Sequence, residues 1–71
     1  MRDEDIVRMT NQIAAFFQPY GRDEAVAGVA GHIRSFWEQR MRAALADLVQ
    51  RDPDRLDPVV RDAALSLGAS T

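Results

Sequence analysis

The absence of cysteine is the feature that most limits how this chain can fold. Its 71 residues make one domain only, and a domain of that size buries just ~60% of the surface that its unfolded chain exposes. Small domains usually gain the missing stability from disulfides, a structural metal or a partner. Disulfides and thiolate metal sites are excluded here. A well-packed helical core, or a protein partner, must therefore stabilise the chain.

The spacing of apolar residues predicts helices along most of the chain. Between residues 6 and 17, apolar side chains recur at intervals of three and four, which places them on one face of a helix. A second apolar stripe starts at Val26 and continues to Val49 without a break in phase. The sequence therefore permits one long helix or two helices that bend near Trp37. We favour the bend, because the first helix is too short to cover the apolar stripe of one long second helix.

Proline, glycine and aspartate mark where the helices begin and end. Pro19 stops the first helix and Gly21 permits the turn after it. Asp57 followed by Pro58 is typical of a helix start, since the aspartate caps the first turn and proline suits the first helical position. We expect a single all-α domain over residues 1–71, a small bundle of three to four helices. The expected helices cover about 3–18, 23–37, 38–51 and 58–67, the middle two being either separate or continuous.

The chain lacks a recognisable catalytic or metal-binding motif. His32 is the only histidine and the only residue that could be nominated as a catalytic base. The aspartates at 52, 54 and 57 lack the glycine and glutamate that an EF-hand calcium loop needs at its sixth and twelfth positions. We therefore expect no catalytic residue, no metal ligand and no cofactor-binding residue, and we interpret the chain as a binding protein and not an enzyme.

Two short apolar blocks share one layout and hold four of the five aromatic residues. Each is a helical segment that ends in an aromatic pair, Phe16-Phe17 in the first and Phe36-Trp37 in the second, with arginines around it. Adjacent residues point about 100° apart around a helix. One member of each pair can therefore face the core while the other lies toward the outside. Exposed apolar surface commonly marks a binding site, and we favour that interpretation over four rings filling one small core.

The two blocks also carry a family resemblance. They read R-M-x-N-Q-I-A-x-F-F and V-A-x-H-I-x-x-F-W-x-x-R-M-R, and they resemble the delta subunit of cytoplasmic NAD-dependent formate dehydrogenase. The resemblance runs from about Ile6 to Leu48. The family typically reads Phe-Trp-Asp-Pro-Arg-Met-Arg, whereas Glu38 and Gln39 precede Arg40 here. The proline that would break the helix in the family is therefore missing from this chain.

The resemblance implies a small cytoplasmic helical protein that binds a molybdenum-containing catalytic (alpha) subunit. Its role would be non-catalytic: support of the assembly, maturation or stability of a complex that oxidises formate and reduces NAD. That complex uses molybdopterin, iron–sulfur clusters, FMN and NAD, and the chain itself would bind none of them. Trp37 would be an interface anchor, so that Trp37→Ala weakens assembly but leaves helicity mostly intact. The residues expected at the protein interface are Arg8, Phe16, Phe17, Arg34, Phe36, Trp37, Arg40, Met41 and Arg42.

The alternative is a self-associating helical protein, such as a dimeric regulator that binds nucleic acid. A net charge of -2 and a pI near 5.1 argue against that activity, because nucleic-acid affinity depends on neutralising several phosphates. No stretch approaches the ~20 apolar residues of a membrane span, and the acidic N-terminus lacks the apolar core of a secretory signal. We therefore expect a soluble cytoplasmic protein with neither nucleic acid nor membrane as a partner.

Overall fold

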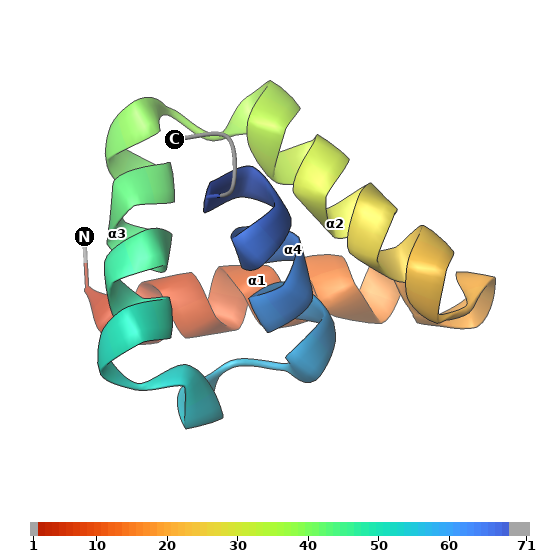
Figure 1. The fold of residues 1–71 in the computed structure, drawn as a ribbon, viewed down its shortest axis with the longest axis horizontal. Helices are drawn as coiled ribbons and strands as arrows, with labels where there is room; N and C mark the ends of the chain where they lie inside the picture. The colour runs from red at the N-terminus through yellow and green to blue at the C-terminus, as the bar shows by residue number, and fades with distance from the viewer. Residues whose placement is uncertain (1, 69–71) are drawn as a thin grey trace.

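The computed structural model describes residues 2–68 and consists of four α-helices joined by short connections (Figure 1). The elements are α1 (Asp3–Phe17), η1 (Gln18–Tyr20), α2 (Arg22–Phe36), α3 (Gln39–Arg51), η2 (Pro53–Arg55) and α4 (Pro58–Gly68), the two η elements being single 3-10 turns. No strand occurs within residues 2–68. The expected fold class, a small all-α bundle, is confirmed, and each helix end lies within one residue of the range expected from the sequence.

The ends of the helices follow from local chemistry. Gly21 adopts a positive φ of 87° between η1 and α2, a conformation that residues other than glycine rarely adopt. At the start of α4, the Asp57 carboxylate accepts a hydrogen bond from the Val59 amide at 2.9 Å, which satisfies one of the unpaired amides of the first turn. Each turn is therefore encoded by the residue that occupies it.

The chain bends between α2 and α3, so the alternative of one continuous helix is wrong. Trp37 and Glu38 are extended, with φ/ψ of -94°/135° and -67°/159°. The Trp37 amide still donates to the carbonyl of Ile33 at 2.9 Å, which closes the last turn of α2. The Trp37 side chain is only 6% exposed. The buried indole therefore holds the bend in place, without the proline that the family pattern carries.

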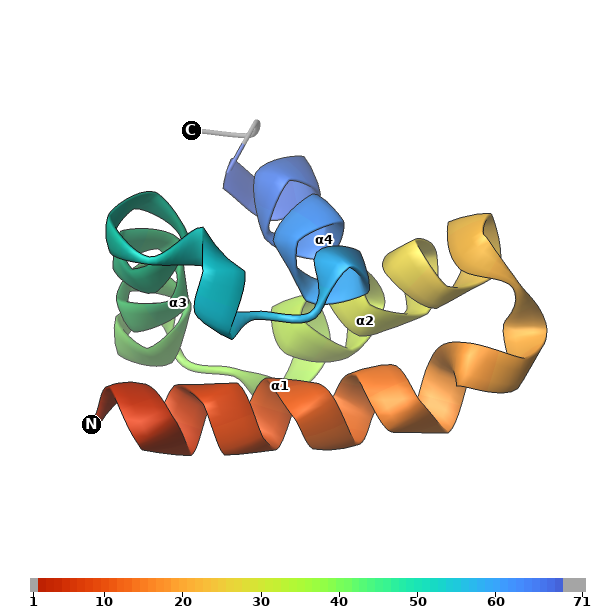
Figure 2. The same cartoon turned by 90° about the horizontal axis from the view of Figure 1, so that it is seen from below.

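The helices enclose one core. In Figure 1, α1, α2 and α3 form three sides of a triangle, and α4 lies across its centre; Figure 2 shows α1 and α4 on opposite sides of the molecule. The most extensive contact between helices joins α2 and α4, followed by that between α1 and α2. The buried apolar cluster comprises Ile6, Ala14, Val29, Ala30, Ile33, Trp37, Leu45, Leu48, Leu56, Val60 and Ala63. Every helix thus contributes to a single cluster.

Two glycines inside α2 differ in what surrounds them. A Cβ atom added at Gly28 would lie 2.5 Å from ring carbons of Phe17, so the absence of a side chain lets this ring rest directly on α2. A Cβ added at Gly31 would meet nothing within 4 Å. Close packing therefore explains Gly28, whereas Gly31 leaves an open position on the helix.

Exposed ion pairs join the start of α1 to the end of α3. The Arg51 guanidinium donates to both carboxylate oxygens of Asp3, at 3.0 and 3.2 Å, and to Asp47 at 2.6 Å. Hydrogen bonding by Arg51 lowers the pKa of the Asp3 carboxyl below its usual value. Arg55 approaches the same carboxylate at 3.7 Å. The N-terminal turn of α1 is thus tied electrostatically to the end of α3.

Alanine at the two glycines should have opposite effects on stability. Gly31→Ala should raise the free energy of unfolding by roughly 0.5–1 kcal/mol, because alanine favours the helix and meets no neighbour. Gly28→Ala should lower it by about 1–3 kcal/mol, because the new methyl group displaces the Phe17 ring. Urea unfolding of both variants measures this. Equal stabilisation by both would show that Phe17 does not pack on Gly28.

The Asp3 ion pair should make stability depend on pH. A carboxyl group whose pKa is lowered by folding stabilises the protein above its unfolded pKa of ~3.9, and this contribution is lost as pH falls through the folded pKa. Wild type should therefore be more stable than Asp3→Asn near neutral pH, and the difference should shrink below about pH 4. Urea unfolding at a series of pH values measures the difference. A gap that stays constant down to about pH 2 would contradict the pairing.

Candidate protein-binding surface

The two aromatic pairs each divide between the core and the surface. Phe16 is 69% exposed, while Phe17 is half-buried and packs against the core cluster. Phe36 is 74% exposed, whereas Trp37 is buried. The expectation that one member of each pair faces inward is therefore confirmed. For Phe16 and Phe17 it follows from the rotation of about 100° between adjacent helical residues, whereas Trp37 lies just beyond the end of α2.

Several residues expected at an interface belong to the core instead. Trp37 is part of the buried cluster, which corrects the expectation that it anchors a partner. The reason is the bend, since the chain leaves the helix at Trp37 and turns its indole inward. Met41 and Phe17 are half-buried and pack against the same cluster. The outward-facing aromatic residues of the two blocks are therefore Phe16 and Phe36.

The nine arginines divide into two groups. Ion pairs within residues 2–68 engage Arg2, Arg8, Arg22, Arg51, Arg55 and Arg61. Arg34, Arg40 and Arg42 form no ion pair with any residue in this range. All three lie in residues 34–42, which we call the α2–α3 corner. Exposed Phe36 lies in the same segment, so the corner joins an apolar ring to three unpaired positive charges.

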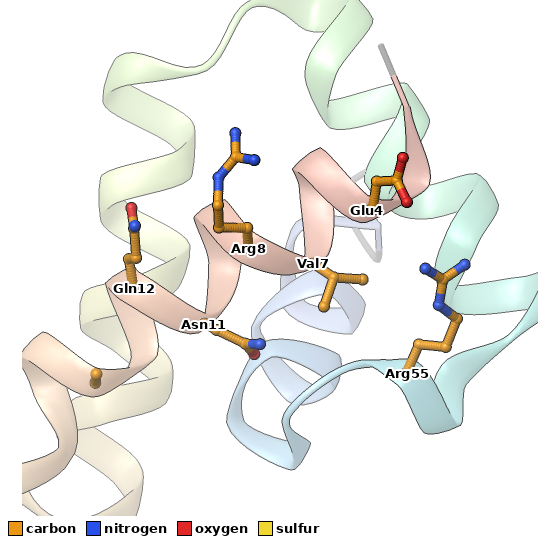
Figure 3. A pocket seen from close by; sticks show the side chains of 7 residues that line it. Glu4, Val7, Arg8, Asn11, Gln12 and Arg55 are labelled. Atoms are coloured by element: carbon orange, nitrogen blue, oxygen red, sulfur yellow. The ribbon is translucent and has the colours of Figure 1, made fainter.

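Arg8, the remaining nominated arginine, belongs to a different surface. Its guanidinium pairs with Asp5 at 3.2 Å on the same helix. Together with Asn11, Gln12 and Arg55 it lines an open hollow of about 490 Å³ along the outer face of α1 (Figure 3). Both arginines of this hollow already have carboxylate partners. The hollow is therefore electrostatically satisfied, and the α2–α3 corner is not.

A cleft of about 460 Å³ adjoins the α2–α3 corner, where α3 faces α4. Arg34 and Arg42 lie at this cleft together with Gln39. Its remaining lining residues are small or apolar: Ala43, Leu45, Ala46, Ala64, Ser66, Leu67 and Gly68. The Nε atom of Arg42 is buried and has no hydrogen-bond partner. This combination of an apolar lining and unpaired guanidinium groups suits an anionic partner that also has apolar groups.

The single histidine stands apart from the two cavities described above. His32 is half-buried, with its ring centroid 4.8 Å from that of Phe36, and it lines neither the hollow on α1 nor the α3–α4 cleft. Within residues 2–68, no group of three histidine, cysteine, aspartate or glutamate side chains is placed to hold a metal ion. No helix in this range is long and apolar enough to span a membrane.

Some residues at the surface could not be identified from the sequence, because they stand in no recognisable motif. Ala43, Ala46 and Ala64 line the cleft because their short side chains leave space between α3 and α4. Leu65 is 63% exposed and Tyr20 is 54% exposed, although neither stands in a recognisable motif. The alanines could have been noticed as small residues at helical spacing. That they line a cleft depends on the packing of α3 against α4, which the local sequence does not show.

Truncation of the adjacent aromatic residues should separate core from surface. Trp37→Ala should lower the free energy of unfolding by about 3–5 kcal/mol, as for other buried aromatic residues. Phe36→Ala should change it by no more than about 0.5 kcal/mol, because the ring is exposed. Thermal unfolding followed by circular dichroism compares them. If the two losses were equal, the assignment of Trp37 to the core and Phe36 to the surface would be wrong.

Comparison with known families covers most of the chain. The family model described as NADH-dependent formate dehydrogenase delta subunit FdsD matches residues 5–64. The matched range includes both aromatic blocks, the buried Trp37 and the α2–α3 corner. Searches of curated proteins and of solved structures find no match. The chain belongs to the FdsD family of NADH-dependent formate dehydrogenase delta subunits.

Proposed function

We propose that this chain is a non-catalytic accessory subunit that binds the molybdenum-containing catalytic (alpha) subunit of a cytoplasmic, NAD-dependent formate dehydrogenase. Binding would support the assembly, maturation or stability of the complex. The observation that carries the proposal is Phe36, which is 74% exposed in the family's second motif. It shares the α2–α3 corner with three arginines that have no carboxylate partner within residues 2–68. Family membership supports the identity of the complex.

The composition of the corner supports a protein as the partner. Binding hot spots are enriched in aromatic residues and arginine. An exposed phenylalanine gains ~25 cal/mol for each Å² of apolar surface that a partner covers. Arginine pairs with carboxylates through a planar fork. Phe16 and Arg8 lie on α1 and are candidates for a second contact with the same subunit.

We propose that the redox centres of the complex belong to other subunits. The chain has no cysteine to hold an iron–sulfur cluster. Its described residues also include no group of side chains suited to a metal ion. These side chains do not fit an iron–sulfur cluster or a metal ion. Our proposal also assigns molybdopterin, FMN and NAD to the other subunits.

Charge argues against self-association through the α2–α3 corner. A two-fold contact would place Arg34, Arg40 and Arg42 of one copy against the same residues of the other. Like charges brought together in an interface cost several kcal/mol. Nucleic acid is also disfavoured, because only three arginines are free of ion pairs within residues 2–68 and the chain carries a net charge of -2.

Replacement of Phe36 should weaken binding without unfolding the chain. Phe36→Ala should raise the Kd for the purified catalytic subunit about tenfold or more, as expected for an aromatic residue at a hot spot. Tyr20→Ala is the matched control, because it removes another exposed aromatic ring at the opposite end of α2. Isothermal titration calorimetry measures both affinities.

Two outcomes of this titration would contradict the proposal. If Tyr20→Ala weakened binding and Phe36→Ala did not, the contact would lie at the η1 end of the molecule. If wild type formed no complex with the catalytic subunit, the accessory-subunit proposal would be wrong.

A further inference from the structure

We propose that the α3–α4 cleft binds an acidic segment of the catalytic subunit. An apolar side chain of that segment would enter the cleft, and neighbouring carboxylates would pair with Arg34 and Arg42. The inference rests on the proposed function, which supplies the partner, and adds the chemistry of the segment that this surface recognises.

The shape and lining of the cleft suit an inserted side chain. Its volume of about 460 Å³ falls within the ~300–1,000 Å³ of typical ligand pockets. Alanines at 43 and 46 on α3 face Ala64 on α4, with Leu45 and Leu67 also lining the space. These side chains offer apolar contact and no charge. A partner that is only anionic would leave this surface uncovered.

Within residues 2–68, the arginines at the cleft have no carboxylate partner, unlike the six arginines outside the α2–α3 corner. The Nε atom of Arg42 is buried and has no hydrogen-bond partner within residues 2–68, so no group in this range anchors the guanidinium through that atom. A carboxylate is the best hydrogen-bond acceptor for a guanidinium group, because its two oxygens match two parallel N–H donors. Arg34, from the last turn of α2, lines the same cleft and offers a second site for a carboxylate.

The charge distribution of the chain indicates that the partner segment is negatively charged. Residues 34–42 contain three arginines and one acidic residue, Glu38, a net charge of +2. Because the whole chain carries -2, all other residues together carry -4. An acidic partner is therefore attracted to this corner and repelled by the remaining surface. Such complementarity fixes the orientation of binding and speeds association.

The apolar lining favours a protein segment over nucleic acid. A phosphate backbone could pair with Arg34 and Arg42, but it has no side chain to fill a cleft lined by alanine and leucine. Nucleic-acid affinity also grows with the number of neutralised phosphates, and this corner offers three arginines. A peptide with an apolar residue between carboxylates satisfies both features of the site.

The absence of lysine from the chain allows a direct test. Arg34→Lys and Arg42→Lys each introduce the only side-chain amine, which a carbodiimide couples to a carboxylate in contact with it. With the purified catalytic subunit bound, both variants should form a cross-link, and mass spectrometry should place it in an acidic segment of that subunit. Arg2→Lys is the control, because it places the amine at the start of α1, and it should give no cross-link to that segment.

Neutral variants measure the contribution of the two charges. Arg34→Gln with Arg42→Gln should raise the Kd for the catalytic subunit by about tenfold to a hundredfold, and binding should depend less on NaCl than for wild type. Arg2→Gln makes the same change in charge for one residue at an exposed pair with Glu4 and should leave the Kd unchanged. Circular dichroism checks that the double variant is folded, and Arg34→Gln alone, at an exposed position, serves if it is not.

The outcomes separate this inference from the proposed function. Binding that survives the double variant unchanged, with no cross-link at either lysine, would overturn the inference and leave the accessory role standing. Absence of any complex with wild type would overturn both. Retention on duplex DNA that the double variant loses, with unchanged affinity for the catalytic subunit, would overturn the inference in favour of a phosphate site.

Discussion

Burial of one indole at the bend between α2 and α3 organises this structure. The Trp37 side chain joins the core where the helical hydrogen bonding of α2 ends, and its extended backbone redirects the chain into α3. Because adjacent residues point in different directions, the inward Trp37 leaves Phe36 outward. The same turn brings α3 to face α4 and places Arg42 at the cleft between them. The core contact and the proposed binding surface therefore have one origin.

The arginines at the α2–α3 corner differ from those elsewhere in having no carboxylate partner within residues 2–68. Away from the corner, arginines pair with aspartates and glutamates: Arg51 with Asp3 and Asp47, Arg22 with Asp62. These contacts are exposed, so each adds little to stability, but they give the arginines outside the corner carboxylate partners. At the corner the arginines have no such partners within residues 2–68. This asymmetry is what the proposed binding of an acidic partner in one orientation would use.

Much of the fold could be predicted from the sequence because helical periodicity and turn residues are local signals. The positions of Pro19, Gly21 and Asp57 mark helix ends, and the observed helices end there or next to them. That the two members of an aromatic pair point in different directions also follows from local backbone geometry. Which member faces inward does not, since that depends on where α2 ends. Trp37 was therefore expected at the surface, although the bend carries it into the core.

The candidate site was predictable only in part. The corner lies within the second motif, whose Phe36 and arginines were nominated because arginine and aromatic residues are typical of interfaces. The cleft could not be foreseen, because alanines at 43, 46 and 64 become a lining only when α3 faces α4. The absence of ion pairs at Arg34, Arg40 and Arg42 within residues 2–68 could not be predicted either, because it depends on how far each arginine lies from the acidic side chains in the folded chain.

Hydrogen–deuterium exchange of the chain, free and bound to the purified catalytic subunit, tests the central claim most directly. The account predicts that binding slows amide exchange in residues 34–46 and 64–68, which form the corner and the cleft. Protection confined to α1, with exchange at the corner unchanged, would contradict the claim that this subunit recognises its partner through the α2–α3 corner.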